Sequence, residues 1–534
     1  MQKTESISAM RKMKEVKKVL LYGNSRNVFS FITQNKPYIV VLGILENSMV
    51  VKEDIFFNQF PILNDYSEVA KIMNEHDVTL ITFPEINAEE IKREMPSLVA
   101  GENWVDSTMF GHVCEVDFSR ICRMFNSTQE AGNYIKAITN NREFALVHGN
   151  CQKDVIHNML KSNKEFVQSY VLLRVHPIHH PQLCLNDINL LKEGFIFGCI
   201  RLFISQPVSR LNKFGDSLST DLMKNEMSPD CKTIIFPNCF FEGYFPDYYP
   251  FRAGAEENFQ KLDEISLFCS SNSILDTLIL QGVSREKAIQ FMHSDFYSSD
   301  KIIEESIKSI ERLEKREKES QMDVIISDYV RQNYQNKLLF RSVNHPIQEV
   351  LVMVAKRILN CVGIIVDNVF YDESFSLRDN DLAVLPCVAR CLFKRDGQEL
   401  YFLHRPKFPE CLVDLDKYYL MYYNYFEPII ANKDNFLKGK IYLNESEIYV
   451  KLTWEKRMNY SKYRIQRVSA EDNVWRTISW NEQGDHHYTD NNVKIGEKYQ
   501  YKVLCYDNQD IVYTSNSVLI HLFPIPDSYL NSKL

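Results

Sequence analysis

One cysteine of the chain lies in a context that suits nucleophilic chemistry. Cys151 belongs to the sequence His-Gly-Asn-Cys-Gln at 148–152, between a short apolar run and an amphipathic stretch. A strand, a turn at Gly149 and a helix would place the sulfur at a helix N-terminus, where unpaired N–H groups favour the thiolate. Asn150 and Gln152 supply side-chain N–H donors for an oxyanion. We predict that Cys151 is catalytic; the alternative is one more small buried residue.

A nucleophilic thiol needs a base that accepts and returns a proton. His345 is the predicted base, because it follows Asn344 directly before a predicted helix, a loop position that suits a site. His176, His179 and His180 compete for this role. Three histidines within five residues also suggest a metal, but cysteine and carboxylate partners at ligand spacing are missing. We therefore predict no metal site.

A second polar segment follows a predicted strand. The stretch 237–247 reads Pro-Asn-Cys-Phe-Phe-Glu-Gly-Tyr-Phe-Pro-Asp and comes directly after an apolar run. Ligands gather at the carboxyl ends of the strands in a parallel sheet. Asn238 is therefore predicted to be a second oxyanion donor or a substrate contact, and Tyr244 and Asp247 can meet sugar hydroxyls. A packed aromatic turn is the alternative.

Four motifs in this order resemble the WcbI family of capsular-polysaccharide biosynthesis proteins over about 143–360. They are Gly149-Asn150-Cys151-Gln152, Ser205-Gln206-Pro207, Pro237-Asn238 with Gly243-Tyr244-Phe245-Pro246-Asp247, and Asn344-His345-Pro346. The resemblance implies a coenzyme A-binding acetyltransferase with an α/β fold related to SGNH hydrolases. In that fold Cys151 matches the nucleophile, Asn238 the later asparagine and His345 the histidine. The chain has Cys where SGNH esterases carry Ser, and it shows no Asp-x-x-His near its end, so their mechanism does not carry over directly.

The resemblance implies transfer of an acetyl group from acetyl-CoA to a sugar hydroxyl of a nucleotide-sugar or polysaccharide acceptor. Either the Cys151 thiolate takes the acetyl group first, or His345 activates the hydroxyl for direct attack and Cys151 only lines the site. The predicted substrate contacts are Gly149, Gln206, Gly243, Tyr244, Asp247 and Asn344. The candidate partners of the CoA phosphates are Arg201, Arg210 and Arg341. An SGNH-like carbohydrate esterase or deacetylase and a non-catalytic scaffold of a polysaccharide-synthesis complex are the alternatives.

The elements that must position these residues indicate an α/β multidomain protein. Apolar runs such as 18–23 and 38–43 alternate with helical stretches, which predicts parallel βαβ units and a Rossmann-like domain over 14–140. Its first turn, at 23–27, has only the first of the three glycines of the dinucleotide fingerprint. A sheet domain without a nucleotide site is the simpler expectation, although Arg26 can meet a phosphate.

The rest of the chain divides into three predicted parts. An SGNH-hydrolase-like α/β catalytic domain is predicted over 143–362 and an extension or connector over 363–434. Period-two patterning over 436–524 predicts a β-sandwich, and its order of aromatic residues resembles a fibronectin type III domain. That resemblance implies a buried Trp454, a tyrosine corner at Tyr499, and a binding or spacer role without chemistry.

Composition limits the other function classes. The chain has 534 residues, a formal net charge of −8 and an apolar fraction of 45%. A basic surface for nucleic acid is therefore not expected. The 13 cysteines form no Cys-x-x-Cys pair, which suits reduced thiols in the cytoplasm. Neither a secretory signal nor a membrane span is predicted. The resemblance implies other polysaccharide-synthesis proteins as partners.

Overall fold

The structure is a computed structural model in which the chain forms two compact units. The first unit comprises 1–238, 319–325 and 351–376, and the second comprises 239–318, 326–350 and 377–534. The structure describes residues 17–22, 28, 32, 39–45, 61–63, 65–76, 78–83, 86–100, 103–106, 113–139, 142–210, 216–249, 271–369, 377, 382, 384–393, 415–430, 437–443, 448–455, 460–469, 474–482, 486–507, 510–523 and 525.

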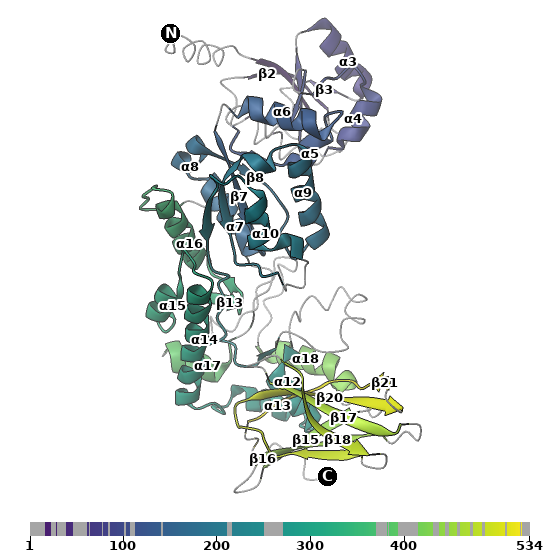
Figure 1. Ribbon diagram of the computed structural model, residues 1–534, viewed down its shortest axis with the longest axis vertical. Helices are drawn as coiled ribbons and strands as arrows, with labels where there is room; N and C mark the ends of the chain where they lie inside the picture. The colour runs from purple at the N-terminus through teal and green to yellow at the C-terminus, as the bar shows by residue number, and fades with distance from the viewer. Residues whose placement is uncertain are drawn as a thin grey trace. The chain divides into compact units, whose positions relative to one another are not determined.

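The first unit begins with a five-stranded parallel sheet in the order β3-β2-β1-β4-β5 (Figure 1). Its strands are β1 (Lys17–Tyr22), β2 (Ile39–Leu45), β3 (Ile62–Leu63), β4 (Thr79–Thr82) and β5 (Trp104–Asp106), with helices α3 (Tyr66–Glu75) and α4 (Ala88–Glu94). This is the strand order of an open doubly wound sheet. Asp65 and Asn87 begin the two helices by accepting backbone N–H bonds. The predicted turn at 23–27 lies outside the described residues.

A second parallel sheet follows in the order β10-β9-β7-β8-β6. Its strands are β6 (Glu115–Val116), β7 (Glu143–His148), β8 (Tyr170–Leu173), β9 (Ile200–Ser205) and β10 (Lys232–Ile235). Strand β6 thus pairs within this sheet, although its residues precede the boundary predicted near 140. The predicted mixed α/β architecture with parallel sheets is confirmed.

Helices cover both faces of the second sheet. They are α5 (Phe118–Cys122), α6 (Thr128–Ile138), α7 (Gln152–Lys161), α8 (Lys164–Ser169), α9 (Pro181–Glu193) and α10 (Thr220–Glu226). Helices α5, α6 and α9 pack together, and α7 packs on α8 and β7; Figure 1 shows α8 and α9 on opposite sides of β7 and β8. The connection after β7 leads to β8 on one side of β7, whereas the connection after β8 leads to β9 on the other side. With right-handed crossovers the winding direction therefore reverses between β7 and β9, and this position is the topological switch point of the sheet.

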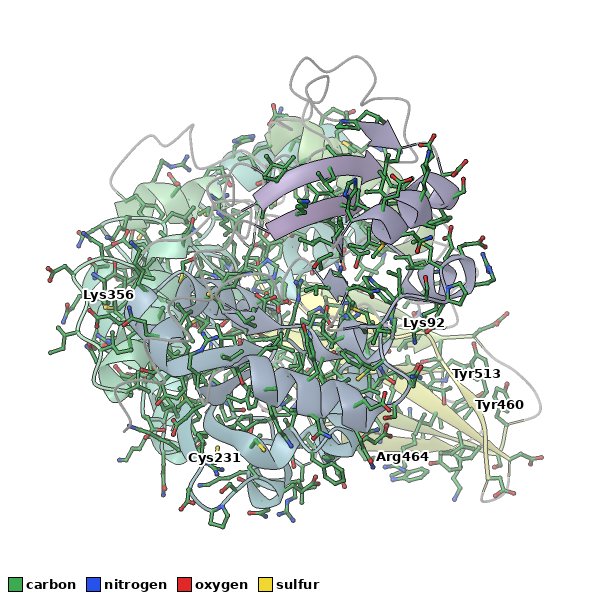
Figure 2. All side chains as sticks on the ribbon, turned by 90° about the horizontal axis from the view of Figure 1, so that it is seen from above. Lys92, Cys231, Lys356, Tyr460, Arg464 and Tyr513 are labelled. Atoms are coloured by element: carbon green, nitrogen blue, oxygen red, sulfur yellow. The ribbon has the colours of Figure 1, made fainter. Side chains whose placement is uncertain are left out.

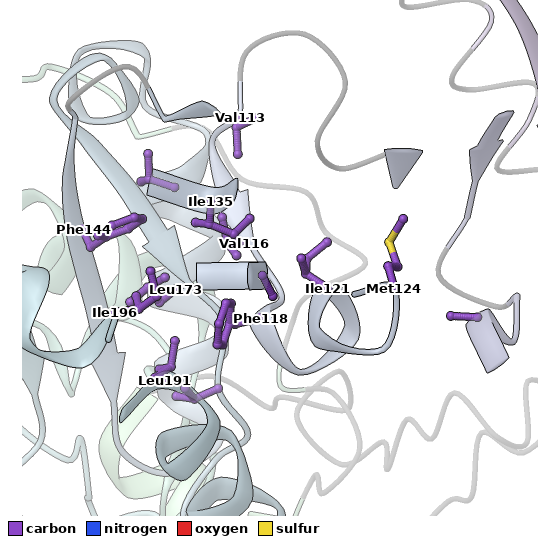
Figure 3. Packing of buried hydrophobic residues seen from close by; sticks show 14 of the residues in the cluster. Val113, Val116, Phe118, Ile121, Met124, Ile135, Phe144, Leu173, Leu191 and Ile196 are labelled. Carbon is purple, nitrogen blue, oxygen red and sulfur yellow. The ribbon is translucent and has the colours of Figure 1, made fainter. Parts of the chain in front are cut away.

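Apolar side chains of strands and helices form a common core in this unit. Phe118 of α5 is buried in one cluster with Ile135 of α6, Leu191 of α9 and Leu173 of β8 (Figure 3). Continuous apolar strands are expected where both faces of a parallel sheet are covered. This core holds the strands of the second sheet in place, and polar residues lie at the ends of these strands.

The second unit combines helices with antiparallel strands. The helices are α12 (Ser273–Leu280), α13 (Arg285–His293), α14 (Ser299–Glu319), α15 (Ser327–Asn333), α17 (Pro386–Phe393) and α18 (Leu415–Ile430). A further helix, α16 (Gln348–Cys361), begins in this unit but belongs mostly to the first unit. Two short antiparallel pairs are β11 (Tyr248–Tyr249) with β12 (Ser271–Asn272) and β13 (Phe340–Ser342) with β14 (His345–Pro346). No helix among the described residues has the length and apolarity to cross a bilayer.

The C-terminal part contains two antiparallel sheets around one core. The first contains β15 (Leu437–Leu443), β16 (Ile448–Trp454) and β19 (His487–Asp490), and the second contains β17 (Lys462–Ser469), β18 (Arg476–Glu482), β20 (Lys498–Asp507), β21 (Asp510–Thr514) and β22 (Val518–His521). Trp454 is buried in the shared cluster, and the Tyr499 hydroxyl accepts the backbone N–H of Lys494 at 3.3 Å. Tyr460 and Tyr513, labelled in Figure 2, stack at the border of this core with ring centroids 6.3 Å apart. The predicted antiparallel region is confirmed; its assignment to fibronectin type III stays a prediction.

Candidate functional site

Four side-chain amides meet at the carboxyl ends of β7, β9 and β10, and we call Asn150, Gln152, Gln206 and Asn238 the amide cluster. Asn150 Nδ2 and Gln152 Nε2 both donate to Asn238 Oδ1, at 3.0 and 3.1 Å. Gln206 Nε2 donates to Gln152 Oε1 at 3.2 Å. Sequence predicted each of these residues separately, and the structure brings them together at the topological switch point, where open α/β sheets bind their ligands.

Two backbone N–H groups determine how the amides are turned. The backbone N–H of Asn150 donates to Gln206 Oε1 at 2.8 Å, and that of Gln152 donates to Asn150 Oδ1 at 2.9 Å. Because a backbone N–H can only donate, it faces the oxygen of the side-chain amide, and the NH2 group of that amide points away from it. Each NH2 group then donates to the oxygen of the next amide, up to Asn238. Both series of hydrogen bonds end on Asn238 Oδ1. The Asn238 carboxamide therefore has one orientation, with its Nδ2 group available as a donor.

Gly149 is required for this arrangement. Its φ of 151° is a conformation that residues with a side chain rarely adopt, and an added Cβ would lie 2.4 Å from Gln206 Oε1. The glycine therefore lets the Gln206 carboxamide reach the backbone of the turn. The carbonyl of Gly149 in turn accepts the N–H of Ile178 at 2.9 Å, which joins the loop after β8 to the same turn.

Cys151 lies directly before α7, as predicted, and is partly buried. Burial is the largest cause that raises the pKa of its thiol, and the nearby Asp154 carboxylate raises it as well, whereas backbone hydrogen bonds from Cys151 and Gln152 lower it; the resulting pKa is about 11. Desolvation therefore opposes the thiolate more strongly than the backbone N–H groups favour it, and the predicted thiolate stays a prediction.

Three of the predicted site residues, His345, Asn344 and Tyr244, lie in the second unit. His345 is buried in β14, and the Asn344 side chain before it lies 3.4 Å from the Ser342 hydroxyl. Tyr244 is completely buried, and its hydroxyl lies 2.8 Å from the carbonyl oxygen of Tyr334. The Tyr244 hydroxyl, which was predicted to contact a sugar, is therefore buried and already hydrogen-bonded to the backbone.

Asp247 and Gly243 are likewise packed inside the second unit. Asp247 accepts the Asn272 amide at 2.6 Å, and burial raises the pKa of its carboxyl to about 6. A Cβ on Gly243 would lie 2.3 Å from the Phe241 ring, which indicates close packing at this glycine.

The three arginines predicted for the CoA phosphates differ in their placement. Arg201 is the second residue of β9, at the opposite end of that strand from Gln206, which is roughly 16 Å away along an extended chain. Arg210 is exposed, four positions after Gln206 and therefore nearer the amide cluster along the chain. Arg341 lies in β13 of the second unit. Arg210 is thus the one of these arginines closest in sequence to the carboxyl edge of the second sheet.

Sequence reasoning missed one acidic partner at the same edge. His176 follows β8, and Asp187 Oδ2 accepts both its backbone N–H at 2.8 Å and its ring Nδ1–H at 2.7 Å. Asp187 lies eleven positions later, on α9, and no local pattern shows that this helix returns to the loop. The predicted absence of a metal is untested, although no group of three or more potential ligands among the described residues is arranged for one.

The middle of the chain matches a known protein family. Residues 144–365 match the family model described as polysaccharide biosynthesis enzyme WcbI. We call this part of the chain the WcbI region. None of the curated proteins matches the chain. A solved WcbI structure, described as a novel polysaccharide biosynthesis enzyme in its native form without a disulfide bond between CoA and a cysteine, is 19% identical with a TM-score of 0.43 and covers 55% of this chain and 96% of its own.

Two further structures match less than a fifth of the chain each. A fibronectin type III-like protein from Clostridium thermocellum is 24% identical over 16% of this chain and 91% of its own, with a TM-score of 0.15. A β-1,2-glucanase from Parabacteroides distasonis is 23% identical over 18% of this chain and 13% of its own, also with a TM-score of 0.15.

Proposed function

We propose that the WcbI region is a CoA-dependent O-acyltransferase that moves an acetyl group from acetyl-CoA to a sugar hydroxyl during polysaccharide biosynthesis. The observation that carries this proposal is the amide cluster at the switch point, beside Cys151. Attack on a thioester carbonyl creates an oxyanion, and N–H donors that are already oriented stabilise it at little cost of reorganisation. The fixed Asn238 Nδ2 is the donor that suits this role.

The burial pattern agrees with a site whose floor is rigid. Gln152 and Gln206 are buried, whereas Asn150, Cys151 and Asn238 are partly exposed. A donor substrate can thus meet the outer three residues while the buried amides hold them. The description of a WcbI structure mentions CoA, which agrees with a CoA-related ligand for the WcbI region.

Of the two routes, direct attack is the better supported. A covalent route requires the Cys151 thiolate, and a pKa of about 11 keeps this group protonated at neutral pH unless a base removes the proton. In the direct route a base takes the proton of the sugar hydroxyl, the new C–O bond forms, and CoA leaves with its sulfur. Cys151 then shapes the site next to the departing thiol.

A transfer assay with a matched pair of variants tests the proposal. The protein is incubated with acetyl-CoA and a panel of sugars and nucleotide sugars, and acetylated sugar and free CoA are measured by mass spectrometry. Asn238→Asp keeps Oδ1 but replaces the donor by an oxygen, so turnover should fall about 100-fold or more. Asn163→Asp is the control: Asn163 caps α8 by accepting the Phe166 N–H at 2.8 Å, and Asp caps helices equally well.

Three results distinguish the alternatives. Acetylated sugar formed in step with free CoA, and lost only in Asn238→Asp, supports the acyltransferase. Acetate released from a model sugar ester without any use of acetyl-CoA would contradict it in favour of an esterase. Neither reaction, with the wild-type protein folded, would contradict it in favour of a scaffold.

A further inference from the structure

We infer that His176 is the general base of the proposed transfer and that Asp187 positions it. This inference rests on the proposed function and deepens it, because it names the group that removes the proton of the sugar hydroxyl. It also differs from the assignment of His345 that the sequence suggests. Three features carry it: the fixed ring, its exposure, and the attachment of its loop to the Cys151 turn.

One carboxylate oxygen fixes the imidazole of His176. Asp187 Oδ2 accepts the backbone N–H and the Nδ1–H of the same residue. The Asp187 side chain is only 6% exposed, so its charge is removed from water and is compensated by these donors. Because Nδ1 carries the proton, the neutral ring has its lone pair on Nε2, the arrangement in which a carboxylate prepares a histidine to act as a base.

The same ring remains accessible. The His176 side chain is 48% exposed although its carboxylate partner is buried. A substrate can therefore reach the imidazole without displacing Asp187. A base has to touch the proton that it removes, so this combination of a buried orienting group and an accessible ring is the one that general base catalysis requires.

The loop of His176 is joined to the turn that carries Cys151. Strands β7 and β8 are adjacent and parallel, so the loops after them leave the same edge of the sheet. Ile178, two residues after His176, donates its N–H to Gly149 O at 2.9 Å. Two residues span at most about 7 Å, which places the backbone of His176 close to the glycine next to the amide cluster.

The proton and the bonds balance in this arrangement. His176 Nε2 takes the proton of the sugar hydroxyl as its oxygen bonds to the thioester carbon, and the charge that develops on the carbonyl oxygen meets Asn238 Nδ2. The C–S bond then breaks, the CoA sulfur leaves with the electron pair, and the imidazolium returns the proton to that sulfur. The products are the acetylated sugar, CoA with a free thiol, and neutral His176.

Many His–carboxylate pairs are only structural, and this chain offers one for comparison. His293 Nε2 lies 2.6 Å from Asp416 Oδ1 in the second unit, and the His293 side chain is 43% exposed, close to the value for His176. Its Asp416 partner, however, is 66% exposed, and an exposed carboxylate holds a ring less firmly. His293→Ala is therefore a matched control for His176→Ala.

The test combines turnover with chemical rescue. We expect His176→Ala to lower kcat for acetyl transfer about 100-fold or more with little change in KM for acetyl-CoA, and His293→Ala and His345→Ala to lower it much less. Added imidazole should restore part of the activity of His176→Ala only, because a free base can replace a missing base but not a missing structural contact. Asp187→Asn keeps the side-chain shape but can donate to Nδ1, so it should also lower kcat.

Each other outcome overturns the inference. Full turnover in His176→Ala, or a folded but inactive His176→Ala variant that imidazole does not rescue, would exclude His176 as the base. If His176→Ala does not fold, the isosteric Asp187→Asn variant decides, and its full activity would exclude the pair. Absence of acetyl transfer in the wild-type protein is a different result: it refutes the proposed function, and the inference falls with it.

Discussion

The two parallel sheets of the first unit follow the same construction rules but show different polar contacts in the described parts of their carboxyl edges. Each has five strands and reverses its winding direction at an inner pair, β1 with β4 and β7 with β9. At the first edge, Thr82 Oγ1 accepts the buried indole N–H of Trp104 at 3.1 Å, and the hydroxyls of Tyr22 and Tyr66 lie 3.0 Å apart. Both contacts thus involve aromatic side chains that lie in the core or pack against it.

At the second edge the polar groups bind one another instead. The amide cluster is held by backbone N–H groups of the Cys151 turn, and the Asp187–His176 pair is joined to the same turn. The fold therefore provides an edge in both sheets, and the residues of the loops decide whether that edge can carry a reaction. This distinction can be tested variant by variant.

The largest expected effect concerns the glycine turn of the second edge. Gly149→Ala brings a Cβ to 2.4 Å from Gln206 Oε1 at a φ of 151°. We expect the strain to cost about 1–3 kcal/mol and the displaced amides to lower turnover about 100-fold. Gly198→Ala is the control, since its Cβ would meet nothing within 4 Å. Equal turnover in the two variants, measured by acetyl transfer, would contradict the role of the turn.

The thiol of the second edge should react slowly and in a pH-dependent way. Because burial raises the pKa of Cys151 to about 11, the side chain is protonated at neutral pH and its thiolate fraction rises about tenfold per pH unit below that value. The rate of its alkylation by iodoacetamide, followed by peptide mapping between about pH 7 and 9.5, should rise throughout. A plateau below about pH 8 would mean that the site favours the thiolate.

The first edge should matter for stability and not for turnover. Thr82→Val leaves the buried Trp104 N–H without its acceptor, which costs about 1–3 kcal/mol. Thr82→Ser keeps the hydroxyl and serves as the control. We expect a lower melting temperature for Thr82→Val with unchanged acetyl transfer per folded molecule. A loss of transfer in the folded variant would give the first sheet a part in the chemistry and remove the contrast.

Among the residues of the second edge, removal of the Cys151 sulfur should have the smallest effect on turnover. If the sugar hydroxyl attacks acetyl-CoA directly, Cys151→Ala should lower turnover less than about tenfold, because the side chain only contacts the leaving group. Intact-mass analysis of the wild-type protein mixed with acetyl-CoA should then show no acetylated enzyme. An acetyl adduct on the wild-type protein, together with an inactive Cys151→Ala variant, would establish the covalent route instead.

Much of the arrangement around Cys151 could be predicted from sequence because it is local. An apolar run, a glycine and an amphipathic stretch over 153–160 predicted the strand, turn and helix that the structure shows as β7, Gly149 and α7. The rule that parallel strands present ligands at their carboxyl ends then predicted that Asn238 belongs to the same edge, whereas Gln206 was predicted from the family resemblance. Each of these inferences needed only short-range patterns and one topological rule.

The remaining features depend on contacts that sequence does not display. Strand β6 has two residues, too few to show a periodicity, so its place in the second sheet was missed. The pKa of Cys151 depends on how deeply the turn is buried, and Asp187 meets His176 only because α9 folds back onto the loop after β8. Tyr244 has a polar hydroxyl, but its completely buried position follows from long-range packing.

The central claim is that the carboxyl edge of the second sheet binds coenzyme A, and calorimetric titration with CoA and acetyl-CoA tests it most directly. We predict saturable heat with the wild-type protein and with Cys151→Ala, and at least about tenfold weaker binding with Gly149→Ala, which disturbs the amide cluster. No heat with the folded wild-type protein, or equally tight binding by Gly149→Ala, would contradict the claim.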